Sequence, residues 1–358
     1  MPKIYPFQPD YAVPPGVTLK EKLEAKGLSQ AALALRSGMA EKTISQIVNG
    51  IAPISCETAE KLELVLGIPA SFWNARERSY REMLVKMDEA KRLEKEVDWL
   101  REIPLAALIG RGYMQKGNEQ RSLVHQALRF FGVSSVEAWR NTWEAPAAQY
   151  RGQAVQAKRP GYVAAWLRMG ELQAESIATR PFDTGAFKTA LTEARKLTIA
   201  SATEWPDKVA ALCAHAGVAA VFTKEIPTAG VSGATRWLTK DKALLQLSLK
   251  YKSDDQLWFT FFHEAGHILL HGKKQVFVEY EISNTTDQER EANLFARDIL
   301  IPQAYQTRLP YLKTRAQIRE FAGAIGVSPG IVVGRLQHDD LVFKSAFNDL
   351  KRKLAWSS

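Results

Sequence analysis

The sequence contains very little cysteine. Only two cysteines, Cys56 and Cys213, occur among 358 residues, and they lie far apart. A scaffold held by disulfides is therefore excluded, and a reducing cytoplasm is the expected location. The chain also lacks an apolar run near the roughly 20 residues that cross a bilayer, so no membrane contact is expected. The first 16 residues have no continuous apolar core and do not resemble a secretory signal.

Neither charge nor hydrophobic content is extreme. Hydrophobic residues make up 46% and charged residues 24% of the chain, which excludes disorder as the dominant state. Lys and Arg together number 48 against 39 acidic residues, giving a net charge of +9. This excess favours an acidic partner such as nucleic acid, but it does not say which part of the chain binds it.

The length predicts two or three domains, and no internal repeat indicates a solenoid. Hydrophobic periodicity and the positions of glycine divide the chain into four regions: a helical region with an N-terminal arm over 1–80, a helical linker or middle region over 81–185, a mixed region of helices and strands over 186–305, and a helical segment over 306–358. The expected fold class is therefore mainly α, with one small α+β domain.

The sharpest local signal is the motif H-E-x-x-H, formed by His263, Glu264 and His267. Residues four apart share one face of a helix, so both imidazoles can bind one metal ion, for which Zn²⁺ is the expected cofactor. Glu264 is predicted to take a proton from a water molecule that the metal activates. Three of the six histidines lie between residues 263 and 271, in an otherwise apolar helix, which argues against a chance match.

A catalytic zinc site with one open position requires a third protein ligand. Position 273, where a metzincin carries His, is Lys273, so a carboxylate from the next helix is expected. Glu289 lies on the apolar stripe of that helix, whereas Glu291 lies about 200° further round it. We predict Glu289 as the third ligand and keep Glu291 as the alternative. Asn293, one turn after Glu289, is expected to orient a ligand.

The roles of the other histidines stay open. His271 follows His267 by one turn and precedes Gly272, so it is either a neighbour of the site or, as we favour, a residue that ends the helix. His215 and His338 are candidates for a transition-state donor, but the sequence does not place them near the motif.

The run from WFTFFHEAGHILLHG through EREANLFARDILIP resembles the ImmA/IrrE family of zinc metallopeptidases, over roughly residues 186–305. The resemblance implies a zincin domain of the gluzincin type, similar to thermolysin, with two His ligands from one helix and a Glu from the next. In that family the third ligand is followed four residues later by Asn or Asp, a spacing shared by Glu289 and Asn293. The resemblance also implies cleavage of proteins, typically helix-turn-helix repressors.

A second motif lies in the segment GLSQAALALRSGMAEKTISQIVNG. Ser29 is predicted to cap a helix that ends at Ser37, Gly38 to supply the turn, and residues 40–48 to form a second helix. This pattern predicts a helix-turn-helix whose second helix enters the major groove of DNA. The predicted contacts are Lys42, Thr43 and Gln46 to base edges and Gln30, Ser45 and Asn49 to phosphates.

The segment around this motif, from PPGVTLKEKLEAKGLSQ to APISCETAEKLELVLGIPASFW, resembles the antitoxin HigA and other XRE-type regulators. The resemblance implies an all-α domain that binds operator DNA, and it adds a toxin as a candidate partner. Such domains read paired half-sites, so a homodimer is expected. Residues 1–80 hold nine basic and eight acidic residues, which predicts weak or dimer-dependent binding.

The segment 306–358 again has a helix, a glycine turn and a helix, similar to the segment that follows the peptidase in ImmA/IrrE proteins. It holds nine basic and four acidic residues, a net charge of +5. A second nucleic-acid contact and a packing unit that completes the peptidase both remain open. Pro329 and Gly330, at the start of its second helix, depart from an ordinary recognition helix.

Together these patterns predict a DNA-binding transcriptional regulator with a zinc endopeptidase domain that cleaves a repressor-type protein, in trans or within itself. One alternative is a non-proteolytic, HigA-like antitoxin or repressor that uses the metal for stability or sensing. The intact Glu264 argues against it, and so does the absence of a cysteine near the motif, because closed structural zinc sites often use one. Another alternative is a peptidase whose N-terminal domain recruits a repressor protein rather than DNA.

Overall fold

The computed structural model describes residues 11–144, 159–201, 203–272, 277–279 and 286–356. Residues 277–279 are described by their backbone alone. The chain forms two compact units, one of residues 1–97 with 119–121 and the other of residues 98–118 with 122–358. Each unit is described by itself. Most of the arm expected over 1–15, and Lys273, lie outside the described residues. Within the described ranges, no helix is both long and apolar enough to cross a membrane.

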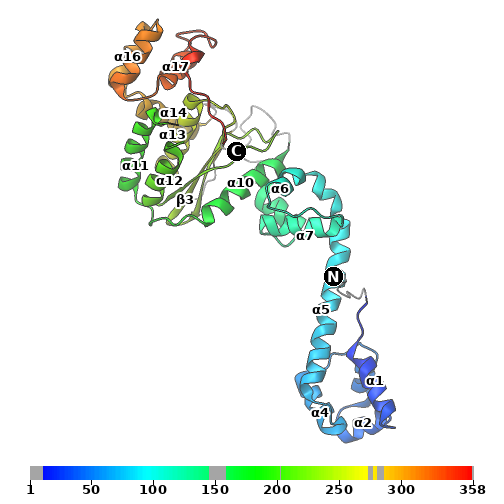
Figure 1. Cartoon of the computed structure of the whole chain (residues 1–358). Coiled ribbons are helices and arrows are strands. Elements are labelled where there is room, and N and C mark those ends of the chain that lie inside the picture. Colours follow the sequence, from blue (N-terminus) through cyan, green and yellow to red (C-terminus); the bar gives the residue numbers. More distant parts are fainter. Residues whose placement is uncertain (1–10, 145–158, 202, 273–276, 280–285, 357–358) are drawn as a thin grey trace, which may run out of the picture. The chain divides into compact units, whose positions relative to one another are not determined.

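The first unit is all-α (Figure 1). Its helices are α1 (Pro15–Ala25), α2 (Gln30–Ser37), α3 (Glu41–Val48), α4 (Cys56–Leu66) and α5 (Ala70–Lys95). The predicted helix start and turn are confirmed. The Ser29 hydroxyl accepts a hydrogen bond from the Ala32 N–H at 3.0 Å, and Gly38 ends α2 with a φ of 69°, which glycine adopts without strain.

Helix α5 begins in the core of the first unit and then becomes exposed. Its Trp73 is fully buried among the leucines and isoleucines of α1 to α4. Further along, ion pairs one turn apart, such as Arg81–Glu77 at 2.7 Å, line its surface. Residues 74–101 contain no Gly or Pro and carry charges of both signs, a pattern that predicts one long, mostly exposed helix. The helix is present, but it ends at Lys95, and a 3₁₀ turn covers Val97–Arg101.

The second unit begins with short helices around an aromatic cluster. These are α6 (Leu105–Gly110), α7 (Gln120–Phe131), α8 (Val136–Trp139), a π-helical turn over Arg140–Glu144 and α10 (Pro160–Glu175). The rings of Trp99 and Phe131 pack edge-on against Trp139, with centroids 5.2 and 5.7 Å away. Trp143 and Trp166 are also buried, so these tryptophans are packing residues.

A four-stranded sheet forms the middle layer of this unit. Its strands are β1 (Val218–Phe222), β2 (Gly233–Thr239), β3 (Lys242–Leu247) and β4 (Phe277–Glu279), in the order β1-β3-β2-β4. The polar turn at Thr239–Lys242 between two strand-like runs predicts a hairpin, and β2 and β3 form it, with Thr239 paired with Lys242. Strand β1 pairs with β3 in parallel, and β4 adds an antiparallel edge that the sequence did not predict.

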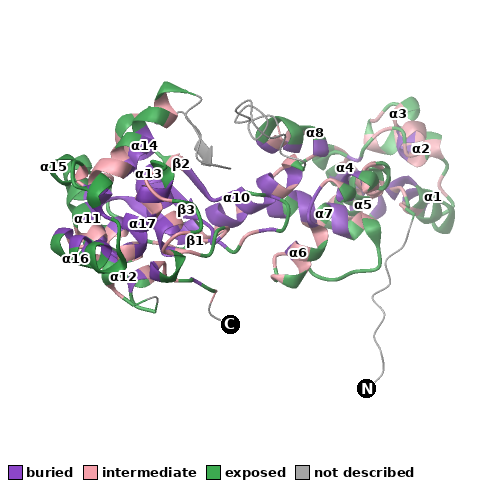
Figure 2. Ribbon diagram, turned by 90° about the horizontal axis from the view of Figure 1, so that it is seen from above, coloured by how far each residue is buried: buried purple, intermediate pink, exposed green. Residues whose placement is uncertain are grey.

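Helices cover both faces of the sheet. On one face, Ala219, Val221 and Leu244 pack against Ala174 of α10. On the other, alternate residues such as Val218 and Leu245 join the main hydrophobic core. That core is shared with α11 (Thr184–Lys196), α12 (Trp205–His215), α13 (Asp254–Leu270) and α14 (Asp287–Leu300). Figure 2 shows the buried strands between these helices, whose outer faces are exposed.

The C-terminal helices α16 (Arg315–Ile325) and α17 (Pro329–His338) pack into the same core. Helix α17 lies directly on the start of α13, since a Cβ at Gly330 would fall 2.4 Å from Asp254 and one at Gly334 2.7 Å from Asp255. This close approach explains the glycine at position 330. The apolar residues of α17 are buried, so its packing favours the interpretation that the tail completes the domain.

The two cysteines have opposite surroundings, which gives a test of this core. Cys56 is exposed, whereas Cys213 is buried in the main core, and burial raises the pKa of the Cys213 thiol to about 12. Because only the thiolate reacts, we expect a thiol reagent to label one cysteine in the native protein and two in denaturant. A Cys56→Ser variant should show no native labelling. Rapid labelling of Cys213 in that variant would contradict the described core.

Candidate functional site

The H-E-x-x-H motif lies on α13, where this helix packs against α14. His263 and His267 are almost fully buried, with 1% and 2% of their surfaces exposed. Gly266 allows the close contact of the two helices, because a Cβ there would lie only 3.3 Å from the Cα of Ala292. This packing brings Glu289, from the first turn of α14, to the two imidazoles.

The three side chains present their ligand atoms to one point. The Nε2 atoms of His263 and His267 are 3.0 Å apart, and the carboxylate oxygens of Glu289 lie 3.2 and 3.5 Å from them. Ligands of a tetrahedral zinc ion at about 2.0–2.1 Å are separated by about 3.3 Å. Two imidazoles and one carboxylate at these distances therefore fit a zinc ion with one position left for water or substrate.

Hydrogen bonds on the far side of each imidazole fix its orientation. His263 Nδ1 lies 2.9 Å from the amide oxygen of Asn293, so Nδ1 carries the proton and the unprotonated Nε2 can bind a metal. His267 Nδ1 lies 2.9 Å from His271 Nδ1, and His271 Nε2 lies 3.1 Å from Glu291 Oε2. If His271 Nε2 donates to Glu291 and His267 Nδ1 donates to His271 Nδ1, then Nε2 of His267 is also unprotonated.

Burial and charge keep this donor set in its metal-binding form. Burial is the main cause that lowers the pKa of His267 to about 4, so its ring is neutral at pH 7. Burial would raise the pKa of Glu289, but the contacts of its carboxylate with His263 and His267 outweigh this effect and lower the pKa to about 2. Neutral imidazoles and an ionised carboxylate are the protonation states that bind a metal.

Glu264 is held between α13 and the sheet. Its side chain is fully buried, and its carboxylate lies against Gly233 of β2, where a Cβ would come within 2.7 Å of Oε1. The Thr235 hydroxyl of the same strand donates a hydrogen bond to the Glu264 backbone carbonyl at 3.2 Å. Neither Gly233 nor Thr235 was predicted. A glycine in a strand signals a close approach, but the sequence alone does not say to what.

The structure therefore gathers Glu289, Asn293 and His271 around the motif and gives Glu291 a contact with His271. His338 lies at the end of α17, and His215 at the end of α12. His271 follows the last residue of α13, as expected of a residue that ends the helix, but it also contacts His267. Its pairing with Glu291 was not predicted, because the two residues come from different helices.

The helix-turn-helix places the predicted DNA contacts on its outer side. Ile44 and Ile47 of α3 are buried, so Lys42 and Gln46 lie away from the buried face of this helix and Thr43 lies at its edge. Lys42 and Asn49 are exposed, and Gln30, Thr43, Ser45 and Gln46 are half-buried. The Asn49 amide donates to the Ser45 carbonyl at 2.8 Å, so this pair also closes the end of α3.

Gly16 sets the position of α3 and was not predicted to do so. A Cβ at Gly16 would lie 2.0 Å from the Ile47 carbonyl oxygen, so only glycine lets α1 approach α3 this closely.

These features define a class: a helix-turn-helix domain joined in one chain to an α+β domain whose H-E-x-x-H helix packs against a helix carrying a third acidic residue. Comparison with protein families supports both parts of this description. Residues 19–73 match the Helix-turn-helix family, and residues 221–337 match the IrrE N-terminal-like domain of the Peptidase M78 family. The resemblance of the first domain to XRE-type regulators, the resemblance of the second domain to the ImmA/IrrE family and the fold class predicted from sequence are thereby confirmed. No curated protein and no solved structure matched the chain.

The two acidic candidates for the third ligand make different predictions for metal affinity. Loss of a group that only supports a ligand typically costs 10–100-fold in affinity. We expect Glu289→Gln to weaken zinc binding by more than about 100-fold and Glu291→Gln by only about tenfold. Competition with a zinc chelator measures both. A larger loss in Glu291→Gln would overturn the assignment of Glu289.

Proposed function

We propose that this chain is a DNA-binding transcriptional regulator with a zinc-dependent endopeptidase domain, in which His263, His267 and Glu289 hold the zinc ion. The observation that carries the proposal is the convergence of two Nε2 atoms and one carboxylate, beside the buried Glu264. A closed structural site would require a fourth ligand from the protein. Among the described residues, the cluster that could hold a metal contains three.

Each residue near the site has a separate task in this proposal. When bound, the zinc ion polarises a peptide carbonyl and lowers the pKa of water. Glu264 takes a proton from the attacking water and passes it to the leaving amine. Asn293 holds the ring of His263, and the pair His271–Glu291 holds the ring of His267. Gly233 leaves space for the Glu264 carboxylate.

We further propose that the substrate is a protein of the repressor type, cleaved in trans or within this chain. Two features support a regulatory role: the helix-turn-helix domain in the same chain and the match to the IrrE N-terminal-like domain. Cleavage would then change transcription by removing a DNA-bound protein. The domain would read its operator as a homodimer in the cytoplasm. The non-proteolytic, HigA-like alternative requires the same metal site but no cleavage.

Replacement of Glu264 by glutamine separates these functions. Glu264→Gln should bind zinc as the wild type does, because Glu264 is not a ligand, and should lose cleavage by at least about 100-fold, since general acid–base catalysis contributes 10²–10⁴-fold. The assay incubates each protein with helix-turn-helix repressors from the same cell and with itself. The matched control is Glu193→Gln, on the exposed face of α11. Equal metal content without cleavage by any of the three proteins would favour the antitoxin or repressor alternative.

DNA binding is tested on the recognition helix. We expect Lys42→Ala and Gln46→Ala each to cost about 1–3 kcal/mol and to relax specificity at one base pair, and Lys42→Ala also to lower the salt dependence, because it removes a positive charge. Selection from a random DNA library, followed by titration at two salt concentrations, measures both. Lys61→Ala on α4, where Lys61 pairs with Glu57, is the control. If no sequence is enriched, recruitment of a repressor protein replaces DNA binding.

A further inference from the structure

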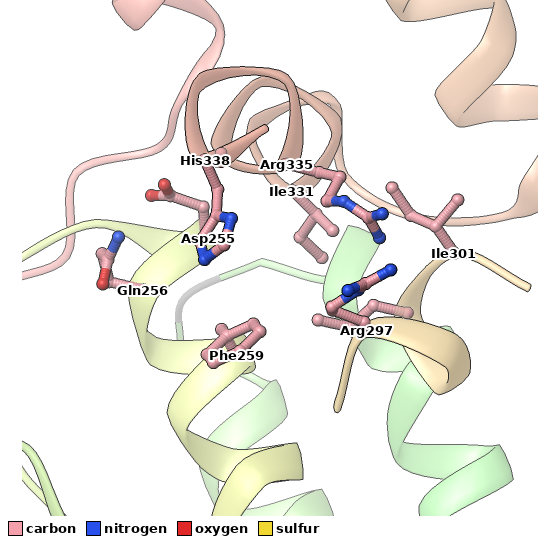
Figure 3. Close-up of a pocket in the computed structure, with 10 residues that line it drawn as sticks. Asp255, Gln256, Phe259, Arg297, Ile301, Ile331, Arg335 and His338 are labelled. Atoms are coloured by element: carbon pink, nitrogen blue, oxygen red, sulfur yellow. The ribbon is translucent and has the colours of Figure 1, made fainter. Parts of the chain in front are cut away.

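A second pocket lies in the same unit, between α13, α14 and α17, and the proposed metal chemistry does not use it. Its cavity measures about 60 Å³. One wall is apolar and consists of Phe259, Ile301 and Ile331, with Leu300 beside them. Two arginines, Arg297 of α14 and Arg335 of α17, are among the polar residues that also line it. Figure 3 shows their guanidinium groups turned toward the same space.

The positive charge of the pocket is only partly compensated. Arg335 donates from Nε to Asp339 at 2.6 Å, but its Nη1 is buried without a hydrogen-bond partner among the described residues. The Nε of Arg297 is also buried without a hydrogen-bond partner, and no ion pair of Arg297 occurs within the described ranges. Asp255, the carboxylate that lines the pocket, forms an ion pair through Oδ2 with Lys351 at 2.7 Å, and its Oδ1 is buried without a hydrogen-bond partner among the described residues. One guanidinium therefore faces the cavity with its charge unpaired.

His338 also lines the pocket and adds no negative charge. A buried guanidinium nitrogen without a partner is costly, and two guanidinium groups that face one space repel each other. An anion between them would relieve both effects. The planar fork of arginine matches a carboxylate, with two parallel N–H···O bonds.

The size and the apolar wall limit the anion further. A single water needs about 10–15 Å³ of such space, so 60 Å³ admits a ligand of only a few heavy atoms. Phe259, Ile301 and Ile331 would cover a short hydrocarbon chain, while the arginines bind the head group. A propionate-sized molecule meets both conditions.

We propose that this pocket binds a small monocarboxylate with a short apolar chain. The pocket lies beside the metal centre but does not share its ligands. Phe259 precedes His263 by one turn of α13, and Arg297 follows Asn293 by one turn of α14. Binding requires neither the metal nor Glu264, so this proposal stands or fails separately from the proposed peptidase activity.

The test uses the metal-free full-length chain, with propionate as the probe and propionamide as its neutral counterpart. Isothermal titration calorimetry at constant ionic strength should give a saturable, one-site isotherm for propionate and none for propionamide. Arg297→Met, which keeps an unbranched apolar stem but removes the charge, should weaken binding at least tenfold. Arg319→Met, on the exposed face of α16, should bind as the wild type does. Arg297→Lys should retain weaker binding, because the charge remains without the fork.

Three results would overturn the proposal. Equal binding of propionate and propionamide would show that charge recognition is absent. Unchanged propionate binding in Arg297→Met would place the site elsewhere. Binding of inorganic phosphate without binding of propionate would show an anion site that makes no use of the apolar wall. A thermal melt of each variant without ligand confirms that it is folded. If Arg297→Met does not fold, the comparison of Arg297→Lys with the wild type still tests the proposal.

Discussion

The packing of α13 against α14 is the constraint on which the candidate metal centre depends. It places two imidazoles and a carboxylate within hydrogen-bond distance of one another in a largely buried seam. Such a cluster would be a poor way to stabilise a core, because each group must lose water before it gains a partner. The surrounding hydrogen bonds leave the Nε2 atoms facing one point. The cluster is therefore understood most simply as a donor set arranged for a metal ion.

The rest of the second unit holds this seam in place. Gly233 and Thr235 of the sheet contact Glu264 of α13, and α17 packs against the first turn of α13. Asp254, at that start, accepts hydrogen bonds from the Arg352 backbone N–H at 3.0 Å and from the Ser328 hydroxyl at 2.5 Å. Residues from the C-terminal segment thus fix the first turn of the helix that carries the motif. This gives the segment a structural task that does not require contact with nucleic acid.

Local patterns allowed much of this to be predicted from the sequence. The spacing of His263 and His267 specifies one helical face, and Ser29 and Gly38 specify the ends of a helix by their own chemistry. Glu289 was favoured over Glu291 because it lies on the apolar stripe of its helix, and the structure brings Glu289 to the imidazoles.

Features that depend on tertiary contacts could not be predicted in this way. The pair His271–Glu291 joins two helices, and its members are twenty residues apart. Strand β4 is only three residues long, too short for a period of two to be recognised. Gly16, Gly233 and Gly330 each permit a close approach, but the partner of a glycine is known only once the fold is known. The pocket of Arg297 likewise requires three helices to be in place.

The most direct test of the central claim is X-ray absorption at the zinc edge of the purified chain, which reports the atoms bound to the metal. The account predicts two imidazole nitrogens at about 2.0–2.1 Å, oxygen ligands from Glu289 and water, and no sulfur. Glu289→Gln should change the oxygen shell and leave the imidazole signal in whatever metal remains bound. A sulfur ligand, or a third imidazole supplied by His271, would contradict the account, because His271 would then be a ligand rather than a support for His267.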